Sequence, residues 1–311
     1  MESIAIVIPV YNRSQLIQRT LDSVVRQTYR PIELILVDNG STDESLVLCK
    51  EFKEKNQSDQ LIVKVLEETK QGANAARNRG LEATESEYVS FFDSDDELFP
   101  EMMNIIHQAI KSKHADIIAY TYTFYENKRK EYVRIRCFSN QARMQIIRGM
   151  LATQNFTVKR DVIRAIGGWN ESLQRWQDWE VGVRLLLHTE DVYWIKQPPL
   201  CRAHIHDATI SGNNFSDAHI QLYKAVETVY SYVQTMERPD TNKLVMAVYF
   251  RFLLLAGNYS REGRKDLGEY YYDQLIQMIR KEYMFRLFCP LIYRYISMGG
   301  RGSWLFAKLF F

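Results

Sequence analysis

Cysteine is scarce in this 311-residue chain, and its scarcity excludes several classes of protein. The four cysteines, at positions 49, 137, 201 and 289, lie far apart and form no C-x-x-C pair. The sequence therefore predicts neither a zinc site nor a disulfide framework. A reducing, cytoplasmic setting fits this pattern. The N-terminus runs directly into a strand pattern without a basic and apolar leader, which predicts no secretory signal.

A large excess of charge and a long hydrophobic run are also missing. The formal net charge is +2, too small for the basic surface of a dedicated nucleic-acid binder. The longest apolar segment, residues 244–257, is too short to span a bilayer and contains Arg251. With 46% hydrophobic and 25% charged residues, the composition is that of a globular protein.

Two phosphate-binding motifs are absent as well. The chain contains no G-x-x-x-x-G-K-[ST] sequence, and no G-x-G-x-x-G follows the first predicted strand, where PVYNR occupies positions 9–13. These absences argue against a P-loop NTPase and against an NAD dehydrogenase.

Short apolar runs that alternate with helical spacing predict an α/β fold. Four runs, at 4–8, 32–37, 61–66 and 88–92, have the composition of strands, and the first is expected to be buried on both faces. Helical spacing between them predicts a doubly wound, mostly parallel sheet. Ser41 and Glu44 have the spacing of a capping box for the second helix.

The second half of the chain is less regular. We expect strands at 115–122 and 192–195, helices at 160–166 and 177–188, and helices throughout the chain from about residue 216. The sequence thus predicts two regions, 1–215 and 216–311.

The fourth strand runs into three carboxylates, Asp93, Asp95 and Asp96. Crowded carboxylates repel one another unless a cation lies between them. Oxygen ligands suit Mg²⁺ or Mn²⁺, which usually bring phosphate oxygens with them, so a diphosphate ligand is expected. The alternative is a solvated acidic turn that caps the following helix. Asn12, Asp38 and Asp93 all follow strand ends, so we expect one edge of the sheet to collect them.

Four motifs occur in the order and spacing of a known family. They are VIPVYN at 7–12, VDNGSTD at 37–43, GANAARN at 72–78 and FDSDD at 92–96. Over about residues 1–210 the chain resembles family 2 glycosyltransferases, which are inverting enzymes. The resemblance implies the GT-A fold, a Rossmann-like, mostly parallel sheet sandwiched by helices, here followed by a helical C-terminal extension.

The resemblance also implies a nucleotide site. Asp38 would accept a hydrogen bond from the base, most simply from uracil N3–H; alternatively, Asp38 is a turn residue that binds its own backbone. Arg77 would contact the diphosphate, unless it is a surface arginine, and Lys70 is a weaker candidate for that role. The nucleotide-binding residues implied are Pro9, Tyr11, Asn12, Asp38, Gly72, Asn74, Arg77, Asp93 and Ser94.

The same resemblance implies a divalent metal, Mn²⁺ or Mg²⁺. Asp95 would bind the ion directly, and Asp93 would contact the ion or the ribose. The ion would neutralise the charge that develops on the departing nucleoside diphosphate. The segment CRAHIHD at 201–207 resembles a late Arg-x-His motif of the family, so either His204 or His206 would complete the site; a strand histidine without a ligand role is the alternative.

Inverting transfer also needs a base for the acceptor hydroxyl. The segment QDWE at 177–180 matches the family's base motif, which assigns Asp178 as the base and Glu180 as a reserve candidate. Gln177 replaces the family's usual glutamate and removes a negative charge beside the base. A capping role at the helix N-terminus is the alternative for Asp178. Trp169, Trp176 and Trp179 would form either an acceptor platform or part of the core.

Residues 280–311 combine basic, aromatic and aliphatic side chains with a single acid, Glu282. This composition suits a membrane-surface segment, or a C-terminal helix packed on the core or in a homodimer. Taken together, the sequence predicts a metal-dependent glycosyltransferase that uses a nucleotide sugar and a saccharide or lipid-linked acceptor in cell-surface glycan synthesis. A nucleotidyltransferase that forms sugar nucleotides and a non-catalytic nucleotide-sugar binder are the rival hypotheses.

Overall fold

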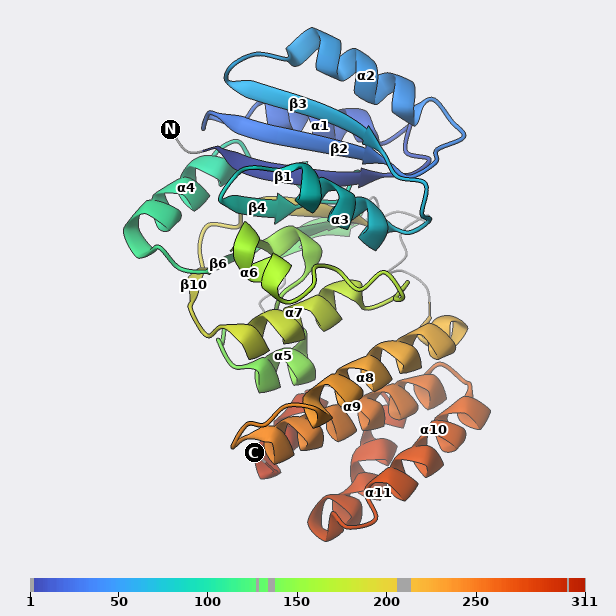
Figure 1. The fold of residues 1–311 in the computed structure, drawn as a ribbon. Coiled ribbons are helices and arrows are strands. Elements are labelled where there is room, and N and C mark those ends of the chain that lie inside the picture. The colour runs from blue at the N-terminus through green and yellow to red at the C-terminus, as the bar shows by residue number, and fades with distance from the viewer. Residues whose placement is uncertain (1–2, 127–128, 134–137, 206–213, 301, 311) are drawn as a thin grey trace.

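The computed structural model describes residues 3–126, 129–133, 138–205, 214–300 and 302–310. An α/β half, drawn in blue to yellow in Figure 1, is followed by a helical half in orange and red. A 3₁₀ turn at Ser216–Ala218 precedes α8, and the division into two regions near residue 216 stays a prediction.

The main sheet has seven strands in the order β10-β6-β9-β4-β1-β2-β3. Neighbouring strands run parallel except for β9, which is antiparallel to both β4 and β6. The strands are β1 (Ile4–Val10), β2 (Ile32–Asp38), β3 (Leu61–Glu67), β4 (Tyr88–Phe91), β6 (Ile117–Tyr120), β9 (Phe156–Lys159) and β10 (Val192–Ile195). All seven residues of β2 are buried, as expected for a strand covered on both faces.

Helices cover both faces of the sheet, and the alternation of side chains along each strand divides the core accordingly. On β1, Ile4, Ile6 and Ile8 pack with α1, α2 and α4, whereas Ala5 and Val7 pack with α3, α6 and α7. The helices of this half are α1 (Ile17–Val25), α2 (Ser45–Asn56), α3 (Ala73–Ala83), α4 (Met102–Lys113), α5 (Ala142–Arg148), α6 (Arg160–Ala165) and α7 (Gln177–His188).

A second, smaller sheet was not predicted. Its order is β5-β11-β7-β8, formed by β5 (Glu97–Leu98), β7 (Thr123–Glu126), β8 (Arg129–Val133) and β11 (Cys201–Ile205). Because β5 begins one residue after Asp96, this sheet fixes the chain that leaves the acidic segment.

The helical half contains α8 (His219–Gln234), α9 (Thr241–Arg261), α10 (Lys265–Met278) and α11 (Tyr283–Ser297). Its apolar side chains join one continuous core cluster with those of α5, α7 and one face of the sheet. Within the described ranges, none of the helices combines the length and hydrophobicity needed to span a bilayer.

The predicted capping box is wrong. Helix α2 begins at Ser45 after Glu44, and no side chain among the described residues caps it from that position. Asp43 performs the equivalent task instead, because its carboxylate accepts hydrogen bonds from the backbone amides of Ser45 and Ser14, both at 3.0 Å. The loop after β1 is thereby tied to the loop after β2.

Candidate active site

The predicted site residues from three strands meet at one edge of the main sheet. Val10, the last residue of β1, pairs in register with Asp38, the last residue of β2. On the other side of β1, Val7 pairs with Phe91 of β4, two residues before Asp93. Parallel strands end at a common edge, so the loops that carry Asn12, Asp38 and Asp93 leave the sheet side by side.

Asp38 is buried, and one of its two carboxylate oxygens has hydrogen-bond partners among the described residues. Its Oδ2 accepts hydrogen bonds from the backbone amides of Gly40 and Ser41, at 3.1 and 3.0 Å. Its Oδ1 is also buried but has no hydrogen-bond partner among the described residues. The turn interpretation therefore holds for Oδ2, and the contact with a base stays a prediction. The other oxygen is an acceptor available to a ligand, and leaving it unpaired costs free energy.

Two asparagines hold the loops next to Asp38 in place through hydrogen bonds. Asn12 lies in the left-handed region (φ 50°), and its Oδ1 accepts a hydrogen bond from the Thr42 amide at 2.8 Å. Asn39 binds the next loop, because its Oδ1 accepts from the Gly72 amide at 2.7 Å and its Nδ2 donates to the Lys70 carbonyl. Gly72 has φ 129°, a conformation that side chains disfavour. The loop before α3 is thus pinned to the turn after β2.

Arg77 lies inside the protein and not on the surface. Its guanidinium donates to Asp93 at 2.8 Å, to Gln177 at 2.9 Å and to Asn74 at 3.0 Å. It also lies over the Trp169 ring, with the guanidinium carbon 4.6 Å from the ring centroid. Its Nε is buried and has no hydrogen-bond partner in the described part of the chain. Arg77 therefore joins α3, the end of β4 and the start of α7.

Gln154, which sequence reasoning missed, bridges two of the carboxylates. Its amide nitrogen donates to Asp93 at 2.7 Å and to Asp96 at 2.8 Å. Burial raises the pKa of both carboxyl groups, and repulsion from the neighbouring carboxylates adds to the rise, while Arg77 opposes it at Asp93. The amide of Gln154 and the guanidinium of Arg77 thus stabilise the crowded carboxylates without requiring a metal ion.

Asp95 is partly exposed at the same edge. Its carboxylate is 3.7 Å from Arg13 Nε, and its carbonyl accepts a hydrogen bond from Arg19. Within the described ranges, no three His, Cys, Asp or Glu side chains form a ready-made metal site. A metal held only by protein side chains does not fit this geometry. One held by one or two carboxylates together with phosphate oxygens does, and that is how Mg²⁺ usually binds.

The structure describes one of the two candidate histidines, His204. The backbone amide of His204 donates to Asp96 at 2.9 Å. Its Nε2 lies 3.6 Å from Glu97, too far for a hydrogen bond, and has no hydrogen-bond partner among the described residues. Burial lowers the pKa of His204, which favours the neutral ring. His206 lies outside the described residues.

Asp178 lies in the first turn of α7, close to the acidic segment. Its negative charge contributes to the raised pKa of Asp93. The neighbouring Gln177 accepts from Arg77 and donates to the Leu173 carbonyl at 3.0 Å, so the start of α7 is anchored on both sides. The residue before it, Trp176, is in the left-handed region (φ 54°).

Arg251 on α9, also missed by sequence reasoning, reaches this site from the helical half. Its guanidinium carbon lies 3.9 Å from the centroid of the Trp176 ring and 5.2 Å from that of Trp179. Burial lowers the pKa of Arg251 to about 9, and the nearby Asp178 opposes the shift. The side chain therefore stays charged at neutral pH, and its charge acts on the candidate base.

The three tryptophans all contact the core, and a role as an acceptor platform stays a prediction. Trp169 and Trp179 are buried in the core, whereas Trp176 is partly exposed. Glu180 is buried and binds Arg184 through both oxygens, at 2.7 and 2.8 Å, so this carboxylate serves an internal ion pair. The geometry therefore favours Asp178 over Glu180 as the group available to an acceptor.

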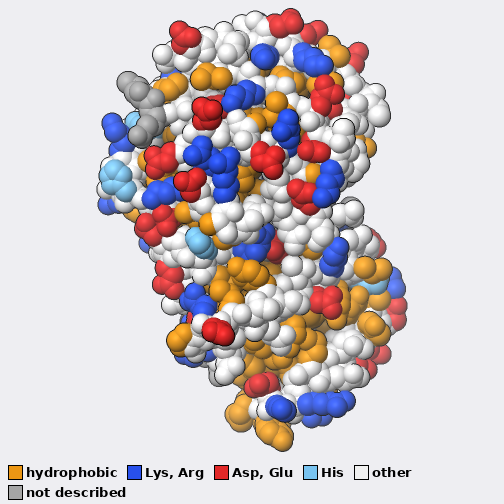
Figure 2. All heavy atoms as spheres, viewed as in Figure 1, with side chains coloured by type: hydrophobic (Ala, Val, Ile, Leu, Met, Phe, Trp, Pro, Cys, Tyr) orange, Lys and Arg blue, Asp and Glu red, His pale blue; other side chains and the backbone are white. Residues whose placement is uncertain are grey.

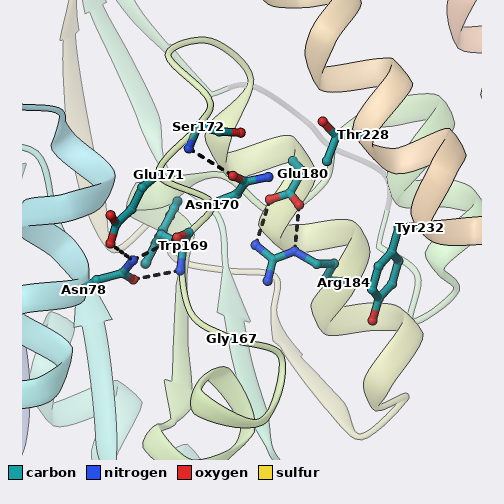
Figure 3. A pocket seen from close by; sticks show the side chains of 10 residues that line it. All are labelled: Asn78, Gly167, Trp169, Asn170, Glu171, Ser172, Glu180, Arg184, Thr228 and Tyr232. Carbon is teal, nitrogen blue, oxygen red and sulfur yellow. Dashed lines mark hydrogen bonds and ion pairs between the residues drawn. The ribbon is translucent and has the colours of Figure 1, made fainter.

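A pocket of about 480 Å³ lies on the other side of the 167–172 segment (Figure 3). The Glu180–Arg184 pair forms one wall, and Thr228 and Tyr232 of α8 face it. Asn78 holds the segment by accepting from the Trp169 amide at 2.8 Å and donating to Glu171 at 2.7 Å. None of the residues predicted to bind nucleotide or metal lines this pocket.

The sequence profile described as glycosyl transferase family 2 matches residues 5–168, more than half of the chain. The chain belongs to glycosyl transferase family 2. The match covers the strands and loops that carry the Asp38, Arg77 and Asp93 motifs, and it ends ten residues before Asp178. The family resemblance inferred from the motifs is confirmed.

Relatives among known proteins are similar over part of their length. Glycosyltransferase GlyA of Streptococcus pneumoniae serotype 4 is 36% identical over 135 residues, 43% of this chain and 19% of the relative. Glycosyltransferase GlyG of the same organism is 36% identical over 125 residues, 40% of each chain. A poly(ribitol-phosphate) beta-glucosyltransferase of Bacillus spizizenii is 39% identical over 116 residues, 37% of this chain and 18% of the relative. The chain thus spans less than half the length of these relatives.

Solved structures extend the likeness over nearly the whole chain. S. aureus TarS 1–349, in complex with UDP-GlcNAc, matches with a TM-score of 0.75 at 17% identity, covering 99% of this chain and 91% of that one. The mannosyltransferase PcManGT from Pyrobaculum calidifontis, in complex with GDP-Man and Mn²⁺, matches with a TM-score of 0.61 at 14% identity, covering 98% and 86%. At these identities the comparison concerns the fold alone, and the expected GT-A architecture with a helical C-terminal region is confirmed.

Proposed function

We propose that this protein is an inverting glycosyltransferase that moves a sugar from a nucleotide-sugar donor, expected to be a UDP-sugar, to a saccharide acceptor. One observation carries the proposal. A buried Asp38 oxygen without a partner among the described residues lies at the same sheet edge as Asp93 and Asp95, and Arg77 links Asp93 to Gln177, the residue before Asp178. Family membership supports the same reaction, and similar folds are known with UDP-GlcNAc and with GDP-Man bound.

The nucleotide would lie across the loops after β1 and β2. Asp38 Oδ1 would accept the base N–H, and a base that offers no donor there would leave this oxygen unpaired. Pro9, the exposed Tyr11 and Asn12 would form the wall, and the pinned loop at Gly72 would close the other side. We assign Asn74, Arg77 and Ser94 to the same site, with Arg77 and Asn74 holding Asp93 in place beneath the nucleotide.

Divalent metal use is a separate part of the proposal. Asp95 and Asp93 would hold Mn²⁺ or Mg²⁺ jointly with the diphosphate of the donor, and His204 or His206 is a further candidate ligand. When bound, the ion would supply charge neutralisation for the leaving nucleoside diphosphate. Arg13, whose guanidinium lies beside Asp95, would add positive charge at the same place.

Asp178 would act as the base. Its carboxylate would accept the proton from the acceptor hydroxyl while that oxygen attacks the anomeric carbon and the bond to the diphosphate breaks. The anchored start of α7 would hold the carboxylate at that point, because its neighbour Gln177 is hydrogen-bonded to Arg77. The acceptor would approach past Trp176, the partly exposed aromatic residue beside the base.

We propose a cytoplasmic site of action, in keeping with the three described cysteines, which are all buried free thiols. The proposed acceptor is a saccharide or lipid-linked saccharide of a cell-surface glycan. The proposed oligomeric state is a homodimer.

Calorimetry with UDP, GDP and ADP, each with and without Mn²⁺, tests the donor site. We expect UDP to bind most tightly and Mn²⁺ to strengthen its binding. A screen of UDP-sugars with saccharide acceptors should then release UDP. Release of pyrophosphate would identify a nucleotidyltransferase, and binding without any turnover would identify a non-catalytic binder.

A further inference from the structure

Helix α11 presents apolar side chains on two faces, although only one of them is packed. Phe285, Cys289, Ile292 and Ile296 are buried in the core. The opposite side exposes a second apolar set, in which the exposed fractions are 80% for Tyr283, 66% for Met284, 71% for Leu287, 59% for Leu291 and 72% for Met298 just past the helix end. A surface helix normally carries polar residues on that side.

The exposed set forms a stripe along the helix. Steps of three, four and seven residues separate Met284, Leu287, Leu291 and Met298, which places them on one side of an α-helix. We call Tyr283, Met284, Leu287, Leu291 and Met298 the α11 outer face. Single exposed apolar residues are ordinary, but a contiguous apolar patch marks an interaction surface. In Figure 2, hydrophobic side chains gather over the lower, helical half of the molecule.

Positive charge surrounds this face. Arg280, Lys281, Arg286 and Arg294 are all exposed, and Glu282 is the only acid among residues 280–300. None of these four cations forms an ion pair with another described residue. The charges therefore remain available to an external partner.

The charge decides between two occupants of the apolar face. A second copy bound about a two-fold axis would bring the same arginines together, and their repulsion would weaken the dimer. An anionic lipid surface would attract them, at roughly fivefold in affinity for each basic residue near the headgroups. Apolar side chains between basic ones are also what an interfacial helix inserts below the headgroups.

We propose that the α11 outer face binds an anionic membrane surface, with Leu287 and Leu291 entering the interface and Arg286 and Arg294 contacting lipid phosphates. The helix would lie in the plane of the interface. The inference is independent of the reaction proposed above, because lipid binding can be measured without donor or acceptor. It would bring a lipid-linked acceptor to the same surface as the enzyme.

Co-sedimentation of the full chain with vesicles tests this inference. Vesicles of phosphatidylcholine with about 30% phosphatidylglycerol are compared with vesicles of pure phosphatidylcholine. We expect binding to the anionic vesicles, at least tenfold weaker binding to the neutral ones, and release by high salt. The double variant Leu287→Glu/Leu291→Glu should lose at least tenfold in affinity, and so should Arg286→Gln/Arg294→Gln, which leaves the apolar stripe intact.

The matched control is Val47→Glu/Ile62→Glu, which places the same charges on exposed apolar residues of α2 and β3. It should bind vesicles as the wild type does, and thermal unfolding of each variant shows whether the fold is kept. Failure of the wild type to bind anionic vesicles would overturn the proposal. So would equal loss in the control, or a dimer in sedimentation velocity that Leu287→Glu/Leu291→Glu dissociates, since the face would then be a contact between two copies.

Discussion

Arg77 on α3 donates a hydrogen bond to Gln177 at the start of α7 across 2.9 Å, and with its other nitrogen it binds Asp93. One buried guanidinium thus couples the carboxylate segment to the helix that carries the candidate base. Gln177, the departure from the family's usual glutamate, still supplies the oxygen that this contact needs.

Replacement of Arg77 by lysine should separate these groups. A single ammonium cannot reach Asn74, Gln177 and Asp93 at once, so we expect the free energy of unfolding to fall by about 1–3 kcal/mol. Turnover should fall at least tenfold. Urea unfolding and initial rates measure the two effects. Arg79→Lys on the same helix is the control, because Arg79 is exposed and its replacement should stay within about 0.5 kcal/mol.

Asp38→Asn tests the proposed base contact. The asparagine oxygen can keep the two turn hydrogen bonds, and its amide nitrogen would then face the base with a donor where an acceptor is needed. We expect UDP to bind about 10- to 100-fold more weakly, which calorimetry measures. Asp59→Asn, at an exposed position, should bind UDP normally. Unchanged affinity of Asp38→Asn for UDP would show that the base does not bind this oxygen.

Asp178→Asn should leave donor affinity within about twofold of the wild type and lower turnover by about 100-fold or more, because the amide cannot accept the acceptor proton. The control is Asp161→Asn, which changes an exposed carboxylate in the first turn of α6. Steady-state rates and calorimetry on both variants provide the comparison. Full turnover in Asp178→Asn would assign the base to another residue.

Asp95→Ala should abolish the effect of Mn²⁺ on UDP binding. The variant loses the carboxylate proposed to share the ion with the diphosphate, so its UDP affinity should be the same with and without the metal. Asp22→Ala, on exposed α1 surface, should keep the difference. If Asp95→Ala still binds UDP more tightly in Mn²⁺, the ion is held elsewhere.

Glu33 should make stability depend on pH. Burial alone would raise the pKa of Glu33, but hydrogen bonds from Lys64, Thr84 and Ser86 outweigh it and hold the pKa below its ordinary 4.5. A depressed carboxyl pKa contributes stability above the unfolded value, and this contribution is lost as pH falls through the folded value. Glu33→Gln should therefore cost about 1–3 kcal/mol at pH 7 and progressively less below pH 4.5. Urea unfolding across this range measures the difference; a cost that does not change with pH would contradict the argument.

The parts of the fold that sequence predicted are those with strong local signals. The strands β1, β2 and β4 are continuous buried runs, and α7 begins and ends at the predicted residues, because apolar periodicity reports burial directly. The short β5 and β9 were missed, since two or four residues of mixed polarity carry no recognisable period. Their pairing depends on contacts with distant segments.

The site residues likewise divide into those with a local sequence signal, which were predicted, and those without one, which were missed. Asp38, Asp93 and Asp178 stand in motifs beside strand or helix ends, so the sequence indicated them. Gln154 is a single amide in a three-residue 3₁₀ helix, Thr153–Asn155, and Arg251 is a single charge within the apolar run of α9. Both act through contacts between segments more than fifty residues apart, which local patterns do not encode.

The hydrophobic cluster that runs from the sheet through α5 and α7 into α9 has a practical consequence for engineering. A chain cut after residue 215 would leave the apolar sides of α5 and α7 in water, and it would also lose the Arg251 guanidinium that packs on Trp176. Chimaeras that exchange the helical end between relatives would need the facing surfaces repacked together.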